Sequence, residues 1–259
     1  MTGVTVPLRA RVLAGETVFG TLSLLPEPAL PELVGAAGYD FFIVDTEHVA
    51  LDGQGLAHVV RAARAAGISP LVRVRHVEEK AFLWMLDTGA EGIVIPLLED
   101  AATARLAHDL MRFPPDGRRT LCSASRAAGH GARRGEAFPR YLAESNERLL
   151  LVGLIETPQG IDNLDAILAE PIDVIFVGRG DLSLKLLGTY APHHPDVTAA
   201  ARSIVERTVA AGKAACMLAY DVEDARAWLA AGCTFLVYSQ PEIVLSNHYR
   251  DALAALRAT

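Results

Sequence analysis

Cysteine is scarce in this chain of 259 residues: only Cys122, Cys216 and Cys233 occur, far apart and without a C-x-x-C pair. This spacing supports neither a disulfide framework nor a zinc site built from cysteine. Cys216 and Cys233 stand in apolar surroundings, where cysteine behaves as a small core residue. Few cysteines suit a reducing compartment, so we expect a cytoplasmic protein.

Long apolar runs and an excess of positive charge are also missing. The first 18 residues contain no apolar stretch of signal-peptide length, and no later stretch approaches the roughly 18 apolar residues of a membrane span. The formal net charge of −7 at pH 7 would repel a polyanion. We therefore expect neither a membrane nor a nucleic acid as a partner.

The chain does contain a repeated alternation of short apolar runs and longer segments of helical period. The runs are rich in Val, Ile, Leu and Phe and do not alternate with polar residues, which is typical of strands buried on both faces of a parallel sheet. The eight predicted strands are 17–24, 41–45, 70–74, 92–96, 149–156, 173–178, 214–218 and 234–239. Each helical segment ends beside a glycine or before a proline, and the predicted helices are 28–38, 51–67, 77–90, 100–113, 160–170, 196–212 and 222–232.

Eight strand–helix units in about 250 residues predict a single (β/α)8 barrel over residues 1–259. A doubly wound open sheet is disfavoured, because no G-x-G-x-x-G turn follows the first strand. The segment 114–146 interrupts the alternation and is rich in Gly, Arg and Ser. Loops of this length are usually functional or disordered. We expect residues 114–137 to form an active-site loop over one end of the barrel, and the rest to form a short helix.

Carboxylates occur at the predicted carboxyl ends of neighbouring strands, where barrels of this kind carry their chemistry. Glu156 ends the fifth strand and Asp181 follows the sixth. Two close carboxylates raise each other's pKa unless a cation lies between them, and oxygen ligands favour Mg²⁺ or Mn²⁺. The alternative is two separate solvated acids, with Asp181 capping a helix. The glycines of FVGRGDLS predict a tight turn whose N–H groups could bind a carboxylate or phosphate.

Arg73 and His48 are candidates for the chemistry itself. Arg73 lies in an apolar strand, where an arginine is costly unless it is paired or faces a ligand. It is therefore either a salt-bridge partner of Asp45 or Glu47, or a clamp for a carboxylate or an oxyanion. His48 follows the second strand and is a candidate general base, with Asp87 as a candidate to orient it.

Six segments combine into a specific pattern that extends over nearly the whole chain: GYDFFIVDTEH, PLVRV, MLDTGAEGIVIPLLEDAATA, FPPDGRRT…SRA, IETPQGIDNLDAIL and IDVIFVGRGDLSLKLLG. This pattern resembles the HpcH/HpaI family of class II (metal-dependent) pyruvate aldolases. The family includes aldolases of 4-hydroxy-2-oxoheptanedioate and of 2-keto-3-deoxy sugar acids. The resemblance implies a (β/α)8 barrel that forms a hexamer, a trimer of dimers, with an exchanged C-terminal helix and sites near subunit interfaces.

The resemblance also implies roles for individual residues. Glu156 and Asp181 would bind a divalent metal cation (Mg²⁺, Mn²⁺ or Co²⁺) that chelates pyruvate or another 2-oxo acid. Arg73 would stabilise the enolate oxygen. His48, oriented by Asp87, would transfer protons through a water molecule.

Four further positions complete the site that the resemblance implies. The backbone amides of Gly180 and Asp181 would hold the substrate carboxylate, and Leu218 would line the substrate site. Asp45 and Glu47 would hold His48, Arg73 or water. The implied reaction removes a proton from carbon 3 of the 2-oxo acid and adds the enolate to an aldehyde, reversibly.

The chain departs from the family pattern at Thr120, Leu154, Arg179–Gly180 and Gln240–Pro241. None of these changes removes a predicted metal or enolate residue, and all lie near the side of the aldehyde acceptor. Arg179 would then either bind an extra carboxylate of the aldehyde or be a surface residue.

Three other functions stay open. Schiff-base aldol chemistry needs a desolvated lysine, and the chain has only Lys80, Lys185 and Lys213; of these, only Lys185 is a possible candidate. A second alternative is a carbon–carbon bond enzyme acting on a CoA thioester, similar to citrate synthase or to citryl and malyl lyases. The third is a protein that binds 2-oxo acids without catalysis.

Overall fold

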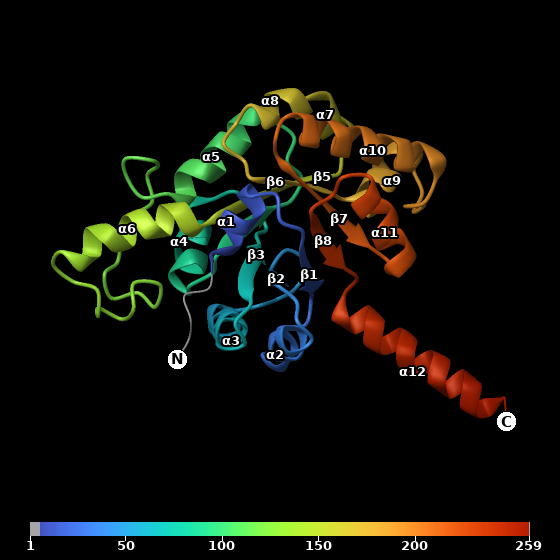
Figure 1. The fold of residues 1–259 in the computed structure, drawn as a ribbon, viewed down its shortest axis with the longest axis horizontal. Coiled ribbons are helices and arrows are strands. Elements are labelled where there is room, and N and C mark those ends of the chain that lie inside the picture. Colours follow the sequence, from blue (N-terminus) through green and yellow to red (C-terminus); the bar gives the residue numbers. More distant parts are fainter. Residues whose placement is uncertain (1–5, 259) are drawn as a thin grey trace.

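The eight apolar runs form parallel strands that close into a barrel in chain order, with helices around it (Figure 1). The computed structural model describes residues 6–258. Residues 1–5 and 259, which the single-domain prediction includes, lie outside the described residues. Every predicted strand is confirmed: β1 (Val18–Ser23), β2 (Phe41–Asp45), β3 (Ser69–Arg73), β4 (Gly92–Ile95), β5 (Leu150–Ile155), β6 (Val174–Val177), β7 (Ala214–Ala219) and β8 (Phe235–Tyr238).

Side chains alternate between the interior of the barrel and the layer under the helices. In β2, Phe41 and Ile43 belong to the interior cluster, whereas Phe42 and Val44 belong to the layer between strands and helices. Both faces of each strand are therefore buried, which explains the uninterrupted apolar runs. A Cβ atom on Gly20 would lie 2.2 Å from the Phe41 ring, so glycine here makes room for that ring inside the barrel.

Most of the predicted helices form close to their predicted positions. They are α2 (Ala29–Ala36), α3 (Gly53–Ala65), α4 (Glu79–Asp87), α5 (Ala101–Met111), α6 (Ala137–Arg148), α10 (Pro195–Ala210) and α11 (Val222–Ala230). The helix predicted over 160–170 is divided at Asn163 into α7 (Pro158–Asp162) and α8 (Leu164–Leu168). Asn163 has a non-helical backbone and donates a hydrogen bond to the Glu99 carbonyl at 2.7 Å, which interrupts the helix.

Three helices had no counterpart among the helices read from periodicity: α1 (Leu8–Leu13), α9 (Arg179–Leu187) and α12 (Pro241–Arg257). Helix α1 closes the N-terminal end of the barrel, where Leu8 and Val12 join the interior cluster. Arg9 and Arg11 on α1 form ion pairs at 3.0 and 2.7 Å with carboxylates that precede strands. The N-terminal end is therefore covered by the chain's own residues.

The long loop between α5 and α6 lies at this same N-terminal end. Arg119 forms an ion pair with Asp87 at 2.8 Å, and the N–H of Ala127 donates to the Asp87 carbonyl at 3.1 Å. Asp87 ends α4, which runs toward the start of β4 rather than toward its carboxyl end. Within one chain the loop thus lies over the N-terminal end of the barrel and does not reach the carboxyl ends of the strands. The reason is topological: α5 ends, and β5 begins, at the N-terminal end.

Helix α12 extends away from the barrel (Figure 1), and none of its residues is buried. Its first turn is attached to the end of β1, because Glu242 accepts hydrogen bonds from the Leu24 N–H at 2.7 Å and from Ser23 Oγ at 3.0 Å. No helix within residues 6–258 has both the length and the apolar character needed to cross a membrane.

Candidate active site

The inward alternation along the strands places ionisable side chains at the carboxyl end of the barrel. Leu71 belongs to the interior cluster, so Arg73, two residues later, points to the same side. Asp45 lies two residues after the interior residue Ile43, and Glu156 lies two residues after the interior residue Leu154, so both also point inward. Asp45 and Arg73 are also direct partners in the register between β2 and β3. Three charged groups therefore meet above one apolar layer.

Asp45 and Arg73 form a bidentate ion pair. Arg73 Nε and Nη2 each donate to one carboxylate oxygen of Asp45 at 2.9 Å. Burial alone would raise the pKa of Asp45, but the hydrogen bonds and charge of Arg73 outweigh burial and lower that pKa. The salt-bridge interpretation of Arg73 is thus confirmed. No hydrogen bond joins Arg73 Nη1 to another of the described residues, so this donor stays available to a ligand.

Glu47 and His48 are held in place by the same aspartate. The backbone N–H groups of Glu47 and His48 donate to Asp45 at 2.9 and 3.3 Å. A Glu47 oxygen lies 3.5 Å from His48 Nε2 and 3.4 Å from Arg73 Nε. Burial raises the pKa of Glu47, and the charges of Asp45 and Asp181 raise it further against the lowering effect of Arg73 and His48. The predicted grouping of Asp45, Glu47, His48 and Arg73 is therefore present.

Glu156 is buried at the end of β5 with 5% of its surface exposed. Its pKa is raised to about 7, mainly by burial and also by the charges of Asp181 and Glu47. One oxygen accepts a hydrogen bond from the Leu97 N–H at 2.8 Å. Leu97 has φ of 47°, a conformation that is uncommon for leucine and that places its N–H on Glu156.

A glycine opposite Glu156 provides the room for this carboxylate. Gly178 follows β6 and is the next inward position after Phe176. A Cβ atom on Gly178 would lie 2.7 Å from one Glu156 oxygen and 2.8 Å from Glu156 Cβ. Any larger residue would displace the Glu156 side chain from the site.

Asp181 lies in the first turn of α9, close enough for its charge to act on both Glu156 and Glu47. The first turn of a helix has N–H groups without intrahelical acceptors and favours an anion. Gly180 and Asp181 both present such N–H groups beside the carboxylates. The predicted carboxylate-binding turn therefore lies next to the predicted metal ligands.

The carboxylates fit a hard divalent cation. A buried Glu156 whose pKa is raised by two nearby carboxylates is a site where a positive charge would be stabilising. Within residues 6–258 no cluster of three or more His, Cys, Asp or Glu side chains is arranged to hold a metal. Two protein carboxylates leave the other coordination positions to water and substrate, which is the usual pattern for Mg²⁺.

The structure contradicts the prediction that Arg179 is a surface residue. Arg179 is 4% exposed, and its guanidinium forms an ion pair with Asp224 on α11, at 2.5 and 3.1 Å. It also donates to the Leu218 carbonyl at 2.9 Å and lies over the rings of Tyr220 and Trp228. Arg179 is thus not a surface residue: both of its terminal nitrogens are bound to Asp224, and its Nε is buried without a hydrogen-bond partner. It joins the turn before α9 to β7, including the predicted substrate position Leu218.

Asp87 does not contact His48 within one chain. It lies at the N-terminal end of the barrel with Arg119 as its ion-pair partner, whereas His48 follows the carboxyl end of β2. The sequence spacing could not show this, because helix α4 carries Asp87 back to the opposite end. The carboxylate beside the His48 ring is Glu47.

Two residues of the site were not predicted. Leu97 contributes through a backbone N–H, and nothing in a leucine's identity indicates a positive φ. Gly178 was assigned to a tight turn rather than to the space beside Glu156, although its place in FVGRG was a usable signal.

The lysines give no support to Schiff-base chemistry. Lys80 and Lys185 are exposed on helices, and Lys213 donates to the Glu170 carbonyl before β7 begins. None of the three is a desolvated amine at the carboxyl end of the barrel.

Comparison with known proteins agrees with this geometry. The profile of the HpcH/HpaI aldolase/citrate lyase family matches residues 20–239. A hydroxypyruvate/pyruvate aldolase of Cupriavidus necator is 30% identical over 97% of this chain and 92% of its own length. A 5-keto-4-deoxy-D-glucarate aldolase of Escherichia coli K12 is 35% identical over 88% of both chains.

Solved structures show the same fold over nearly the whole chain. An HpcH/HpaI aldolase/citrate lyase family protein from Burkholderia cenocepacia J2315 has a TM-score of 0.90 at 32% identity, covering 96% of this chain and 98% of that one. The citrate synthase SbnG has a TM-score of 0.87 at 31% identity, covering 97% and 98%.

Proposed function

This chain belongs to the HpcH/HpaI aldolase/citrate lyase family, and we propose that it is a divalent-metal-dependent aldolase. In this proposal it forms the enolate of pyruvate or a related 2-oxo acid and adds it reversibly to an aldehyde. The two aldolase relatives, one of which is named for hydroxypyruvate and pyruvate, support this substrate class.

Glu156 supports the proposal most directly. It is a buried carboxylate that keeps a pKa of about 7 beside Asp181 and Glu47. A carboxylate in this state has little structural use, because burial and like charges both oppose its ionisation. Glu156 and Asp181 would hold the metal, and bound Mg²⁺, Mn²⁺ or Co²⁺ would act as a Lewis acid on the 2-oxo group.

The substrate would be oriented by donors already in place. The N–H groups of Gly180 and Asp181, in the first turn of α9, would bind its carboxylate, and Leu218 would line the site from β7. Arg73 would direct its available Nη1 at the oxygen that becomes negative as the enolate forms. A preorganised donor aimed at developing charge typically contributes about 10²- to 10³-fold to the rate.

His48 would accept the proton from carbon 3 through a water molecule. Its ring is 56% exposed and so is accessible to solvent. Glu47, at 3.5 Å from Nε2, is the carboxylate that orients it within one chain, in place of Asp87. The same histidine would return the proton in the cleavage direction.

Exchange of the methyl protons of pyruvate with deuterium, followed by NMR, tests enolate formation without knowledge of the aldehyde. We expect exchange with Mg²⁺ or Mn²⁺ and none after EDTA treatment. Glu156→Ala should abolish exchange, and Arg73→Ala should slow it by about 10²-fold or more. Arg140→Ala, an exposed arginine on α6, is the matched control and should exchange at the wild-type rate.

No exchange with any divalent metal would overturn the proposal for pyruvate. Binding of pyruvate without exchange would instead support a non-catalytic 2-oxo acid binding protein. A stable adduct after borohydride treatment with pyruvate would indicate Schiff-base chemistry.

A second candidate function is addition of the enolate to a different acceptor, as in a citrate-synthase-like enzyme. It is favoured by the similarity to citrate synthase SbnG. Assays of the purified protein with oxaloacetate, with and without acetyl-CoA, would reveal it, since a CoA-dependent product would exclude simple aldehyde addition.

We also propose a cytoplasmic homo-oligomer in which α12 packs against a second copy. This helix exposes five large apolar side chains: Ile243, Val244, Leu245, Tyr249 and Leu253. A hexamer built as a trimer of dimers is the assembly expected for this family.

A further inference from the structure

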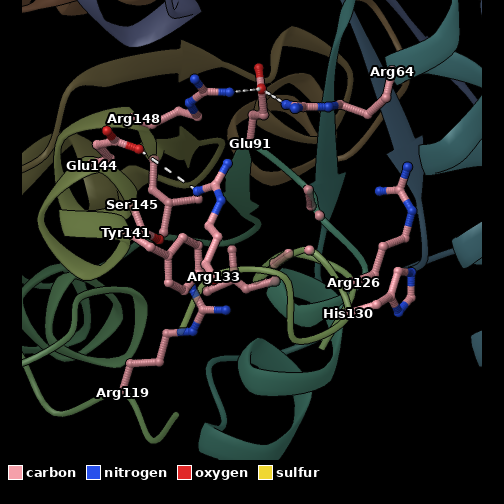
Figure 2. A pocket seen from close by; sticks show the side chains of 16 residues that line it. Arg64, Glu91, Arg119, Arg126, His130, Arg133, Tyr141, Glu144, Ser145 and Arg148 are labelled. Carbon is pink, nitrogen blue, oxygen red and sulfur yellow. Dashed lines mark hydrogen bonds and ion pairs between the residues drawn. The ribbon is translucent and has the colours of Figure 1, made fainter. Parts of the chain in front are cut away.

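A second cavity lies at the N-terminal ends of β4 and β5, at the other end of the barrel from the candidate active site. It has a volume of about 430 Å³, within the usual range of about 300–1,000 Å³ for small-molecule sites. Five arginines line it: Arg64, Arg119, Arg126, Arg133 and Arg148 (Figure 2). They come from α3, the loop between α5 and α6, and α6.

Carboxylates do not balance this positive charge. Glu91 is shared by Arg64 and Arg148, and Arg133 reaches Glu144 at 3.7 Å (Figure 2). Glu144 is also the partner of Arg140, which lies outside the cavity. Even when Asp87, the partner of Arg119, is included, three carboxylates face five guanidinium groups in a chain whose net charge is −7.

Arg119 and Arg126 have donors to spare. Arg119 is 4% exposed, and its Nε is buried without a hydrogen-bond partner, although Nη2 is bound to Asp87. Arg126 donates to the Thr88 carbonyl, a neutral acceptor. A buried donor without an acceptor is costly, so a ligand that supplies acceptors there would be stabilising.

The guanidinium groups also repel one another. The pKa of Arg64 is lowered, first by burial and then by the charges of Arg148, Arg126 and Arg133. These side chains therefore lie close enough to act together on one ligand. Guanidinium groups bind carboxylate and phosphate oxygens in a bidentate manner, which makes arginine the usual residue for such ligands.

We propose that this arginine cavity binds a small polyanion, an organic molecule that carries a phosphate or several carboxylates, at the opposite end of its own barrel from the candidate active site. Strands β4 and β5 connect the two. Glu91 lines the cavity just before β4. Leu97, whose N–H binds Glu156, lies just after β4, six residues beyond Glu91 and roughly 20 Å away along an extended strand.

Calorimetric titration of the full chain, freed of metal by EDTA treatment and then dialysed into buffer without EDTA or metal, tests this proposal. The probes are inorganic phosphate, pyrophosphate and citrate, at 50 and 200 mM NaCl. We expect saturable binding that weakens with salt, and stronger binding of pyrophosphate or of citrate will show whether phosphate or carboxylate groups are preferred. Arg126→Gln/Arg133→Gln should weaken binding at least tenfold, since hydrogen bonds to charged groups are lost.

Arg226→Gln, an exposed arginine on α11, is the matched control and should bind within twofold of wild type. If the double variant unfolds, the single variant Arg133→Gln replaces it in the titration, because its side chain is exposed and its loss should not disturb the fold. Absence of binding by all three probes would overturn the proposal. Equal binding by the double variant would also overturn it, because the anion would then occupy another site such as the first turn of α9.

Discussion

Single residues at the carboxyl end of the barrel show how buried charge is stabilised by a partner. The Asp45 side chain is fully inaccessible and the Arg73 side chain is 12% exposed. Bidentate geometry satisfies both groups, but it makes each dependent on the other. Asp45 also holds the backbone of Glu47 and His48, so this pair positions the residues on which the proposed proton transfer depends.

Arg73→Met should lower the free energy of unfolding by about 3–5 kcal/mol, because the buried Asp45 carboxylate is left without its partner. Asp45→Asn combined with Arg73→Met should recover part of this loss, since no buried charge is then unpaired. Urea unfolding measures both. Arg140→Met removes an arginine that is 82% exposed and should change stability by less than about 1 kcal/mol. If Arg73→Met and Arg140→Met lower the free energy of unfolding equally, Asp45 and Arg73 do not form a buried, mutually dependent pair.

Glu156 should make the metal-free protein less stable as pH rises. Its pKa is about 7 in the folded chain against an ordinary value of 4.5. The folded state therefore binds this proton more tightly than the unfolded chain does. The resulting stabilisation is complete below about pH 4.5 and is lost as pH rises to about 7.

Unfolding in EDTA at pH 5 and pH 8 measures this effect. The loss of stability between the two pH values should be roughly 2–3 kcal/mol larger for wild type than for Glu156→Gln. Glu79→Gln, on the exposed start of α4, should behave as wild type. The same pH response in wild type and Glu156→Gln would show that Glu156 has an ordinary pKa.

At the scale of elements, neighbouring strands share the space at their ends. Glu156 follows β5, and the position opposite it after β6 is Gly178. The start of α9 is attached to β7 and α11 through Arg179, which fixes the turn that presents Gly180 and Asp181. The site is therefore built from side chains on strands and N–H groups on one helix.

Gly178→Ala should leave the barrel folded but weaken metal binding at least tenfold, because the new Cβ would meet the Glu156 carboxylate at 2.7 Å. Titration with Mn²⁺, followed by calorimetry, measures the affinity, and circular dichroism checks the fold. Gly53→Ala is the control, since its Cβ would have an ordinary contact at 3.8 Å. Unchanged Mn²⁺ affinity in Gly178→Ala would argue against Glu156 as a ligand.

At the scale of the whole molecule, α12 extends away from its own barrel (Figure 1). It has 17 residues and no buried side chain among them, and its first turn is anchored to β1 by Glu242. An exposed apolar face of this length is costly in water unless another surface covers it. A second copy of the chain supplies such a surface without further components.

Ile243→Asp/Leu253→Asp should reduce the assembly to a smaller species, because charge is introduced into the apolar face of α12. Light scattering after size-exclusion chromatography measures the mass. Arg226→Asp, on the surface of α11, should leave the mass unchanged. If wild type is a monomer at micromolar concentration, the proposed role of α12 is wrong.

The barrel was predictable from its apolar runs, and several residues of the candidate site were predictable from where those runs are interrupted or end. Strand order followed from apolar runs, since a strand buried on both faces must be apolar throughout. Glu156, Arg73 and His48 were found because each interrupts or ends such a run. Asp181 was found because it closely follows another such run. The resemblance then added Leu218 and the role of the Gly180 and Asp181 backbone amides. The backbone contribution of Leu97 has no sequence signal of this kind, because it depends on φ and not on side-chain type.

The sequence by itself determined the eight strands, most of the helices and the end of the barrel that carries the candidate site, because these depend on periodicity along the chain. Only the tertiary structure decided which charges meet. It placed Asp87 and the loop between α5 and α6 at the N-terminal end of the barrel, buried Arg179 against Asp224, and gathered five arginines from separate elements into one cavity. The physical reason is that ion pairs and pKa shifts depend on distance and burial in space, and residues far apart in the chain supply both.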